Sequence, residues 1–203
     1  ILEGYGLTET SPVVSLNPPE TKSFTGTVGL PVPSMEISIR DEGGMELGIG
    51  EPGEICVRGP NVMKGYWQRP DESKKVLTDD GWLMTGDVAI MDENGFFTIV
   101  DRKKDLIISG GFNVYPQIIE QALYEHPDIE EAAVIGIPDD YRGEAAKAYV
   151  KLKAGAPPLT LESLTAFLVP RLGKHEMPRA LEIRAALPRT SVGKLSRKAL
   201  RDE

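Results

Sequence analysis

The first half of the chain alternates apolar and polar residues in short runs separated by turn-forming residues. Such runs have the two-residue period of a half-buried strand. A short helix is predicted over residues 71–77, with Asp71 as its N-cap. Many short strands joined by glycine-containing turns indicate a small barrel or sandwich. The predicted strands are residues 27–29, 36–40, 53–58 and 96–100.

The second half mixes helical and strand-like patterns. Residues 116–124 carry apolar side chains at helical spacing with Pro116 in the first turn. Thr160 is predicted to cap a second helix that runs to Leu172. The sequence therefore predicts an α+β chain: a β-rich, barrel-like first part, then a small α/β lobe with a three-stranded sheet, helices and a two-stranded hairpin. The other predicted elements are strands at 132–137, 146–152 and 181–185 and a helix at 196–203.

The distribution of charge supports this division. Residues 1–101 carry 7 basic and 17 acidic side chains (net −10), whereas residues 102–203 carry 16 and 14 (net +2), which sum to the net charge of −8. Two halves whose net charges differ this much are typical of separate structural units. We predict the end of a larger domain at 1–101, a hinge at 102–105 and a small mobile domain at 106–203. A nucleic-acid partner is not expected, because the basic residues are not concentrated.

Composition adds limits on location. No apolar run approaches the roughly 18 residues of a membrane helix, so only peripheral membrane contact is left open. The single cysteine, Cys56, excludes an internal disulfide and favours a reducing compartment, so we expect a cytoplasmic protein. Cys56 lies in an alternating run and is interpreted as a buried apolar residue. The first residues lack the features of a signal peptide, and we expect the sequence to begin inside a longer protein.

The segment VDRKKDLIISGGFNVYP, residues 100–116, is the most informative part of the chain. Its charged residues, 101–105, are poorly suited to a hydrophobic core. The apolar triplet 106–108 follows, and then Gly110-Gly111. Two glycines allow the backbone to approach a ligand closely. The segment predicts a hinge followed by a backbone binding loop. The alternative is an ordinary hairpin after a polar loop.

Residues 5–10, YGLTET, place several nucleotide-binding groups side by side. The ring of Tyr5 can stack on a base, and the Thr8 hydroxyl can donate to a phosphate oxygen. The carboxylate of Glu9 can hold Mg²⁺ beside that phosphate. The alternative is a polar turn.

Two further segments carry candidate chemistry. Asp87 follows Thr85-Gly86 after an apolar run and could accept hydrogen bonds from both ribose hydroxyls, or it could simply cap a turn. Residues 188–195 predict a mobile loop that presents Lys194. The loop lacks the glycine spacing of a P-loop and the Ser or Thr that would follow the lysine. The alternative is a solvated surface lysine.

Five segments follow one another in an order typical of one enzyme superfamily: YGLTET, GEICVRGPNVMKGYW, TGD, DRKKDLIISGGFNVYP and PRTSVGKLSRKALR. On these segments, which span the whole chain, the sequence resembles the C-terminal portion of an AMP-forming acyl-CoA synthetase of the adenylate-forming superfamily. Several ordered motifs are far more specific than one. The fourth segment favours fatty-acid–CoA ligases over peptide-synthetase adenylation domains.

The resemblance implies a ligase of lipid metabolism that works in two steps. A carboxylate attacks the α-phosphate of ATP in the presence of Mg²⁺ to give acyl-AMP and pyrophosphate, and the thiol of CoA then displaces AMP. The small C-terminal domain would rotate between the steps. Because the family's pyrophosphate loop and most of its acyl pocket belong to an upstream part, the 203 residues alone are expected to be inactive.

The same resemblance assigns roles in the nucleotide site. Tyr5, next to Gly6, would stack on adenine, and Thr8 would hold a phosphate oxygen. Glu9 would ligate Mg²⁺, and Asp87 would bind the ribose hydroxyls.

It also assigns roles near the hinge and in the small domain. Arg102 would contribute to the ribose site, and Lys194 would be the adenylation lysine. Lys104 would be the hinge residue, and Ser109-Gly110-Gly111 would line the tunnel for the pantetheine arm of CoA.

The sequence departs from the family pattern in two places. Ile118 stands where an acid is usual, and His175-Glu176 stand where aromatic or basic residues are commoner, so a salt bridge and CoA contacts there are open. Two other functions also remain open: an adenylation domain that loads a carrier protein, and a non-enzymatic binding module that keeps the scaffold.

Overall fold

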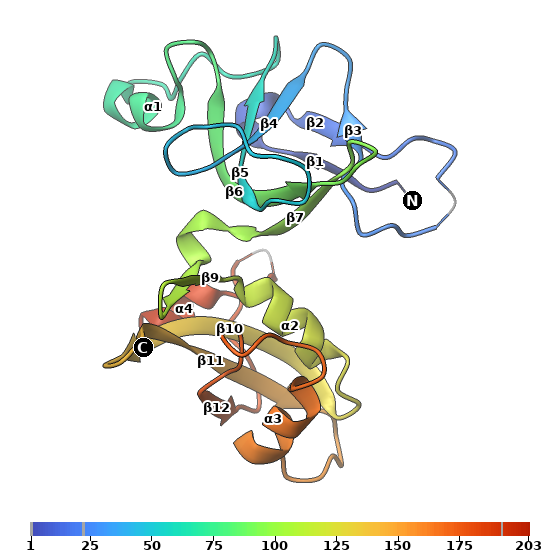
Figure 1. Ribbon diagram of the computed structural model, residues 1–203, viewed down its shortest axis with the longest axis vertical. Coiled ribbons are helices and arrows are strands. Elements are labelled where there is room, and N and C mark those ends of the chain that lie inside the picture. The colour runs from blue at the N-terminus through green and yellow to red at the C-terminus, as the bar shows by residue number, and fades with distance from the viewer. Residues whose placement is uncertain (1, 22, 192) are drawn as a thin grey trace. The chain divides into compact units, whose positions relative to one another are not determined.

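The computed structural model describes residues 2–21, 23–191 and 193–203. The chain divides into two compact units, Ile1–Lys103 and Lys104–Glu203. Figure 1 shows the elements of each unit. The boundary lies inside the segment 102–105 that the sequence predicts as a hinge. No helix in the described part of the chain is long and apolar enough to cross a membrane.

The first unit contains two antiparallel sheets. A three-stranded sheet has the order β1-β2-β3, and a four-stranded sheet has the order β4-β5-β6-β7. Neither strand order closes on itself among the described residues, so the predicted barrel-like arrangement is not confirmed. The strands are β1 (Gly4–Gly6), β2 (Val13–Leu16), β3 (Leu30–Pro31), β4 (Glu36–Arg40), β5 (Gly53–Arg58), β6 (Leu83–Met91) and β7 (Phe97–Arg102).

The alternating pattern identified β4, β5 and most of β7 correctly, but residues 27–29 do not form a strand. The reason is Gly29, which has φ +85° and lies so close to β2 that a Cβ would stand 2.0 Å from the Leu16 carbonyl carbon. Buried apolar residues of the strands, including Ile55, Leu83 and Phe97, form the core of the unit. Cys56 is buried as expected, and burial raises the pKa of its thiol to about 11.

The helix of the first unit, α1 (Pro70–Val76), begins earlier than predicted. Arg69 occupies the N-cap position, so the expectation that Asp71 caps this helix is wrong. Pro70 is favoured at the first helical position because its missing N–H would have no partner there. Asp71 instead lies in the first turn with Glu72, where negative charge complements the helix dipole.

The second unit is built on one five-stranded sheet. Its strand order is β10-β11-β8-β9, and β12 pairs in parallel with β11. The predicted hairpin, β8 with β9, is not separate from the main sheet because Ser109 pairs with Gly143 of β11. The strands are β8 (Ile107–Ser109), β9 (Phe112–Val114), β10 (Ile129–Asp139), β11 (Gly143–Leu152) and β12 (Ala180–Ile183).

Helices pack on both faces of this sheet. Successive side chains of β10 point to opposite faces, and Ala132 and Val134 pack with the buried residues of α2 (Pro116–Tyr124) and α3 (Leu161–Leu168). Ala133 and Ile135 pack with Leu200 of α4 (Arg197–Arg201). Thr160 caps α3 as predicted, but α3 ends at Leu168 rather than Leu172.

Candidate functional site

The Tyr5 hydroxyl and the Asp87 carboxylate meet in the first unit, although they are 82 positions apart in the sequence. The hydroxyl of Tyr5, on β1, donates a hydrogen bond of 2.6 Å to Oδ2 of Asp87, on β6. Asp87 is buried and Tyr5 is half-buried. Burial, and then the hydrogen bond to Asp87, raise the pKa of the Tyr5 hydroxyl far above its usual value. Tyr5 therefore remains a proton donor to this carboxylate at neutral pH.

The backbone around Asp87 is a bulge within β6, not the turn of the alternative interpretation. Between the pairs Glu54–Val88 and Cys56–Met84, three residues of β6 (Thr85-Gly86-Asp87) stand opposite one residue of β5. Gly86 has φ +75°, a conformation that glycine adopts readily. Bulges of this kind redirect side chains and are common beside active sites.

Side chains of the strand pair hold this bulge in place. The Thr85 hydroxyl donates to the carbonyl of Ile55 at 2.7 Å, and the N–H of Gly86 donates to Oε1 of Glu54 at 2.9 Å. Oε2 of Glu54 in turn accepts from Nζ of Lys103 at 2.8 Å. The Thr-Gly-Asp segment thus has a physical explanation: its first two residues fix the backbone that aims the Asp87 carboxylate.

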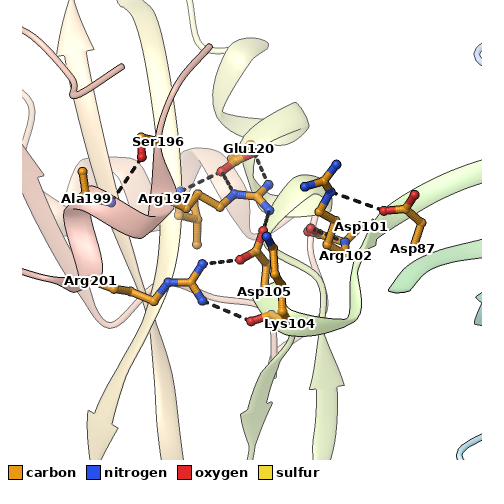
Figure 2. Close-up of polar contacts among 11 residues, drawn as sticks. Asp87, Asp101, Arg102, Lys104, Asp105, Glu120, Ser196, Arg197, Ala199 and Arg201 are labelled. Carbon is orange, nitrogen blue, oxygen red and sulfur yellow. Dashed lines mark hydrogen bonds and ion pairs between the residues drawn. The ribbon is translucent and has the colours of Figure 1, made fainter. Parts of the chain in front are cut away.

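Arg102 lies directly across the sheet from Asp87, and Figure 2 shows the contact between them. Nε of Arg102 is 3.3 Å from Oδ1 of Asp87, and the arginine side chain is 60% exposed. Each carboxylate oxygen therefore already has one partner. Because an ionised carboxylate offers about four lone-pair sites, Asp87 keeps acceptor capacity for further hydroxyl groups.

The Thr8–Glu9 segment forms a short 3-10 helix, η1 (Thr8–Thr10), immediately after β1. Thr8 is exposed, and Oε1 of Glu9 accepts a hydrogen bond of 2.9 Å from the Tyr66 hydroxyl. Thr10 is fully buried and donates to backbone carbonyls, which gives it a structural role. Gly6 is explained by packing alone, since a Cβ there would lie 1.9 Å from the Pro12 carbonyl oxygen.

The Gly110-Gly111 turn joins β8 to β9 in the second unit. The two glycines have φ +59° and +83°, and a Cβ on either would meet nothing within 4 Å. A two-residue hairpin turn of this kind needs left-handed backbone at both positions, which explains why both residues are glycine. The space beside the turn is therefore open, and Gly110 lines a groove there.

The groove has a volume of about 240 Å³ and combines aromatic rings with cations. The rings of Phe112 and His175 stack with centroids 5.0 Å apart. Tyr141 is almost fully exposed. Phe112, Tyr141, Arg142 and Lys174 were not expected from the sequence because they lie on three separate segments. The lining residues are Ser109, Gly110, Phe112, Tyr141, Arg142, Lys174 and His175.

Lys194 lies in a tight hairpin near the C-terminus. The N–H of Thr190 donates to the Lys194 carbonyl at 2.7 Å, and Gly193 provides the turn with φ +82°. Val192, inside the predicted loop, lies outside the described residues. Lys194 is exposed, and no described residue forms a hydrogen bond or ion pair with its Nζ. The hairpin therefore presents a lysine that is available to an anion.

Lys104 is the first residue of the second unit and lies in the 3-10 helix η2 (Lys103–Asp105). Its side chain is exposed, and its carbonyl accepts a hydrogen bond of 3.1 Å from Nη1 of Arg201. Among the described residues, no three or more His, Cys, Asp or Glu side chains are grouped to hold a metal ion. A Mg²⁺ ion held by one carboxylate, such as Glu9, and by substrate phosphates needs no such group.

Comparison with known proteins decides the family. Residues 1–67 match the family described as AMP-binding enzyme, and residues 118–194 match the AMP-binding enzyme C-terminal domain. The chain belongs to the AMP-binding enzyme family. The predicted resemblance to the C-terminal portion of an AMP-forming acyl-CoA synthetase is thereby confirmed, and the two matches fall on the two units.

Individual relatives of this AMP-binding enzyme chain support the same grouping. It is 52% identical over 204 aligned residues to a long-chain-fatty-acid–CoA ligase of Bacillus subtilis (strain 168), covering 100% of this chain and 36% of the relative. ATP-bound MatB from Rhodopseudomonas palustris superposes with a TM-score of 0.93 at 39% identity, over 100% of this chain and 40% of that structure.

A third similar structure is the o-succinylbenzoate CoA synthetase MenE from Bacillus subtilis in complex with its acyl-adenylate intermediate. It has a TM-score of 0.89 at 38% identity, over 100% of this chain and 41% of that structure. The chain therefore spans little more than a third of the length of the curated relative and about two fifths of each structure.

Proposed function

We propose that a full-length enzyme carrying this sequence joins a long-chain fatty acid to CoA with ATP, through an acyl-AMP intermediate. In the first step a carboxylate oxygen attacks the α-phosphorus of ATP and pyrophosphate leaves. In the second step the sulfur of CoA attacks the acyl carbon, AMP leaves, and the thiol proton is released. The high identity to a long-chain-fatty-acid–CoA ligase supports the class of acid.

The meeting of Tyr5, Asp87 and Arg102 is the observation that carries this proposal. Three strands, β1, β6 and β7, bring an aromatic ring, a buried carboxylate and a guanidinium together. A ribose could donate its two hydroxyls to the remaining lone pairs of Asp87, while Tyr5 supplies a flat face for adenine. Tyr5 would also orient Asp87, since its hydroxyl donates to one carboxylate oxygen.

Lys194 would supply the charge that the first step requires. The attacking carboxylate and the α-phosphate are both anions, and two unit charges about 4 Å apart repel by roughly 4 kcal/mol at an effective dielectric constant of 20. An ammonium group placed between them offsets this repulsion and stabilises the charge that develops on the phosphate. The exposed Nζ of Lys194, without a partner among the described residues, is suited to this role.

Thr8 and Glu9 would serve the phosphates. The exposed Thr8 hydroxyl can donate to a phosphate oxygen. Glu9 would hold Mg²⁺, which when bound neutralises phosphate charge. The Tyr66 hydroxyl donates to Oε1 of Glu9 and restrains that carboxylate, while Oε2 keeps its lone pairs for the ion.

The groove beside Gly110 would bind CoA for the second step. Its two cations, Arg142 and Lys174, can pair with phosphates, and its stacked rings of Phe112 and His175 offer a surface for a base. We propose that Ser109-Gly110-Gly111 lies along the pantetheine arm, and that rotation at Lys104 exchanges Lys194 for this groove at the active site.

The proposal is tested by comparing the 203-residue chain with a full-length ligase that carries it. We expect the full-length enzyme to convert a long-chain fatty acid, ATP and CoA to acyl-CoA, AMP and pyrophosphate in equal amounts. The 203 residues alone are expected to give negligible ATP–pyrophosphate exchange, because the chain covers only 36% of the ligase relative. Robust exchange by the purified chain, or transfer to a carrier-protein thiol in preference to CoA, would contradict the proposal.

A further inference from the structure

A cluster of four charged side chains links the first residues of the second unit to its last helix. We define the Asp105 cluster as Asp105, Glu120, Arg197 and Arg201; Figure 2 shows it. Nη2 of Arg197 is 2.6 Å from Oε2 of Glu120, and its Nη1 is 3.4 Å from Oδ2 of Asp105. Arg201 donates to Oδ1 of Asp105 and to the carbonyl of Lys104. Three of the four side chains are at most 17% exposed.

The geometry of these contacts is specific. Arg197 uses Nε at 2.9 Å and Nη2 at 2.6 Å against the two oxygens of Glu120, a bidentate pairing that fixes the direction of the guanidinium plane. Breaking one member of a partly buried group of charges leaves the others without compensation. The Asp105 cluster therefore constrains orientation more strongly than an exposed ion pair would.

Helix α4 does not need this cluster to remain attached to the sheet. Leu200 is 3% exposed and packs against Ala133 and Ile135 of β10. Apolar packing is not directional, whereas the paired guanidinium groups are. The cluster thus sets how α4 is oriented toward η2, and the Lys194 hairpin is joined to α4 through Ser196, whose N–H donates to the Pro188 carbonyl at 2.9 Å.

We propose that Asp105, Glu120, Arg197 and Arg201 are positioning residues that hold the Lys194 hairpin in a fixed orientation to Lys104. Rotation about the backbone dihedral angles of Lys104 then moves Lys194 while the orientation of its hairpin relative to Lys104 stays the same. This inference rests on the proposed function, in which Lys194 serves the first step and Lys104 is the pivot. The acid that pairs with Arg197 is Glu120, two residues beyond Ile118 on α2, so the cluster does not depend on an acid at position 118.

The first test uses the 203-residue chain and does not depend on catalysis. In Asp105→Asn, we expect amide exchange at Thr190 and Ser196 to accelerate by about tenfold, while the paired amides of β10 and β11 exchange at the wild-type rate. Arg171→Gln, which breaks an ion pair with Glu125 elsewhere in the unit, is the control and should leave both sites unchanged. Unchanged exchange at Thr190 and Ser196 in Asp105→Asn would overturn the inference.

The second test uses a full-length ligase carrying the sequence. Asp105→Asn should lower kcat for acyl-AMP formation by about tenfold, leave the KM for ATP within about twofold, and largely spare the thioester step from supplied acyl-AMP. Arg197→Lys, which keeps the charge, should lose less activity than Arg197→Gln. An equal fall in both half-reactions would indicate a merely structural role and overturn the inference. If Lys194→Ala proves harmless, the proposed function fails, yet the exchange experiment still decides whether the cluster holds the hairpin.

Discussion

Replacing Lys194 with alanine in a full-length ligase that carries this sequence should abolish acyl-AMP formation almost selectively. We expect the first half-reaction to slow by about 10²–10³-fold, the cost of removing one preorganised charge or donor from a transition state. Thioester formation from supplied acyl-AMP should continue within about threefold of the wild-type rate, because no second anion has to be brought to the phosphate in that step. Pyrophosphate exchange and single-turnover thioester formation measure the two steps separately.

Lys198→Ala is the matched control for this experiment. Lys198 is also exposed and lies four residues further on, in α4, so its loss removes the same charge from the same region. It should leave both half-reactions unchanged. Equal losses in the two half-reactions of Lys194→Ala, or a comparable loss in Lys198→Ala, would remove the assignment of Lys194 to the first step.

Replacing Lys104 with proline should have the opposite selectivity. Proline fixes φ near −65° and also restricts the residue before it. The neighbouring residues are already held: Lys103 pairs with Glu54 in the first unit, and Asp105 is bound by two arginines in the second. Lys104 lies between these two held residues: its side chain is exposed, and its carbonyl accepts a hydrogen bond from Arg201 of the second unit. We therefore propose that the backbone rotation occurs at Lys104.

We expect Lys104→Pro to slow the thioester step by about 100-fold, because a proline penalty of about 3 kcal/mol corresponds to two factors of ten in rate. Acyl-AMP formation should fall much less. Lys104→Ala, which removes the charge but keeps the backbone free, is the control and should retain both steps. If the proline variant forms thioester normally, Lys104 is not the pivot.

Local patterns predicted much of the fold. Period-two runs located β4 and β5, and a hydroxyl at Thr160 located the start of α3, because these signals act within a few residues. Local patterns failed where tertiary packing determines the backbone conformation. Residues 27–29 alternate like a strand, but the close approach of Gly29 to β2 imposes a left-handed conformation. The position of Asp87 in a bulge of β6 depends on Glu54, which no local pattern reveals.

The candidate site was predictable in its individual residues but not in their contacts. Tyr5 and Asp87 stand out by type, yet the hydrogen bond between them requires two strands that the sequence alone does not pair. The groove beside Gly110 collects residues from three separate segments, so no local pattern brings them together. The Asp105 cluster spans more than ninety positions in sequence, so its pairing had no local signal.

The fate of the carboxylate oxygen tests the central claim most directly. A full-length ligase carrying this sequence should be given a long-chain fatty acid with both carboxyl oxygens labelled as ¹⁸O, together with ATP and CoA, and the products should be analysed by mass spectrometry. Attack on the α-phosphorus followed by displacement of AMP predicts one ¹⁸O in the AMP phosphate and one in the acyl-CoA carbonyl. Unlabelled AMP, or label in inorganic phosphate with release of ADP, would contradict the account.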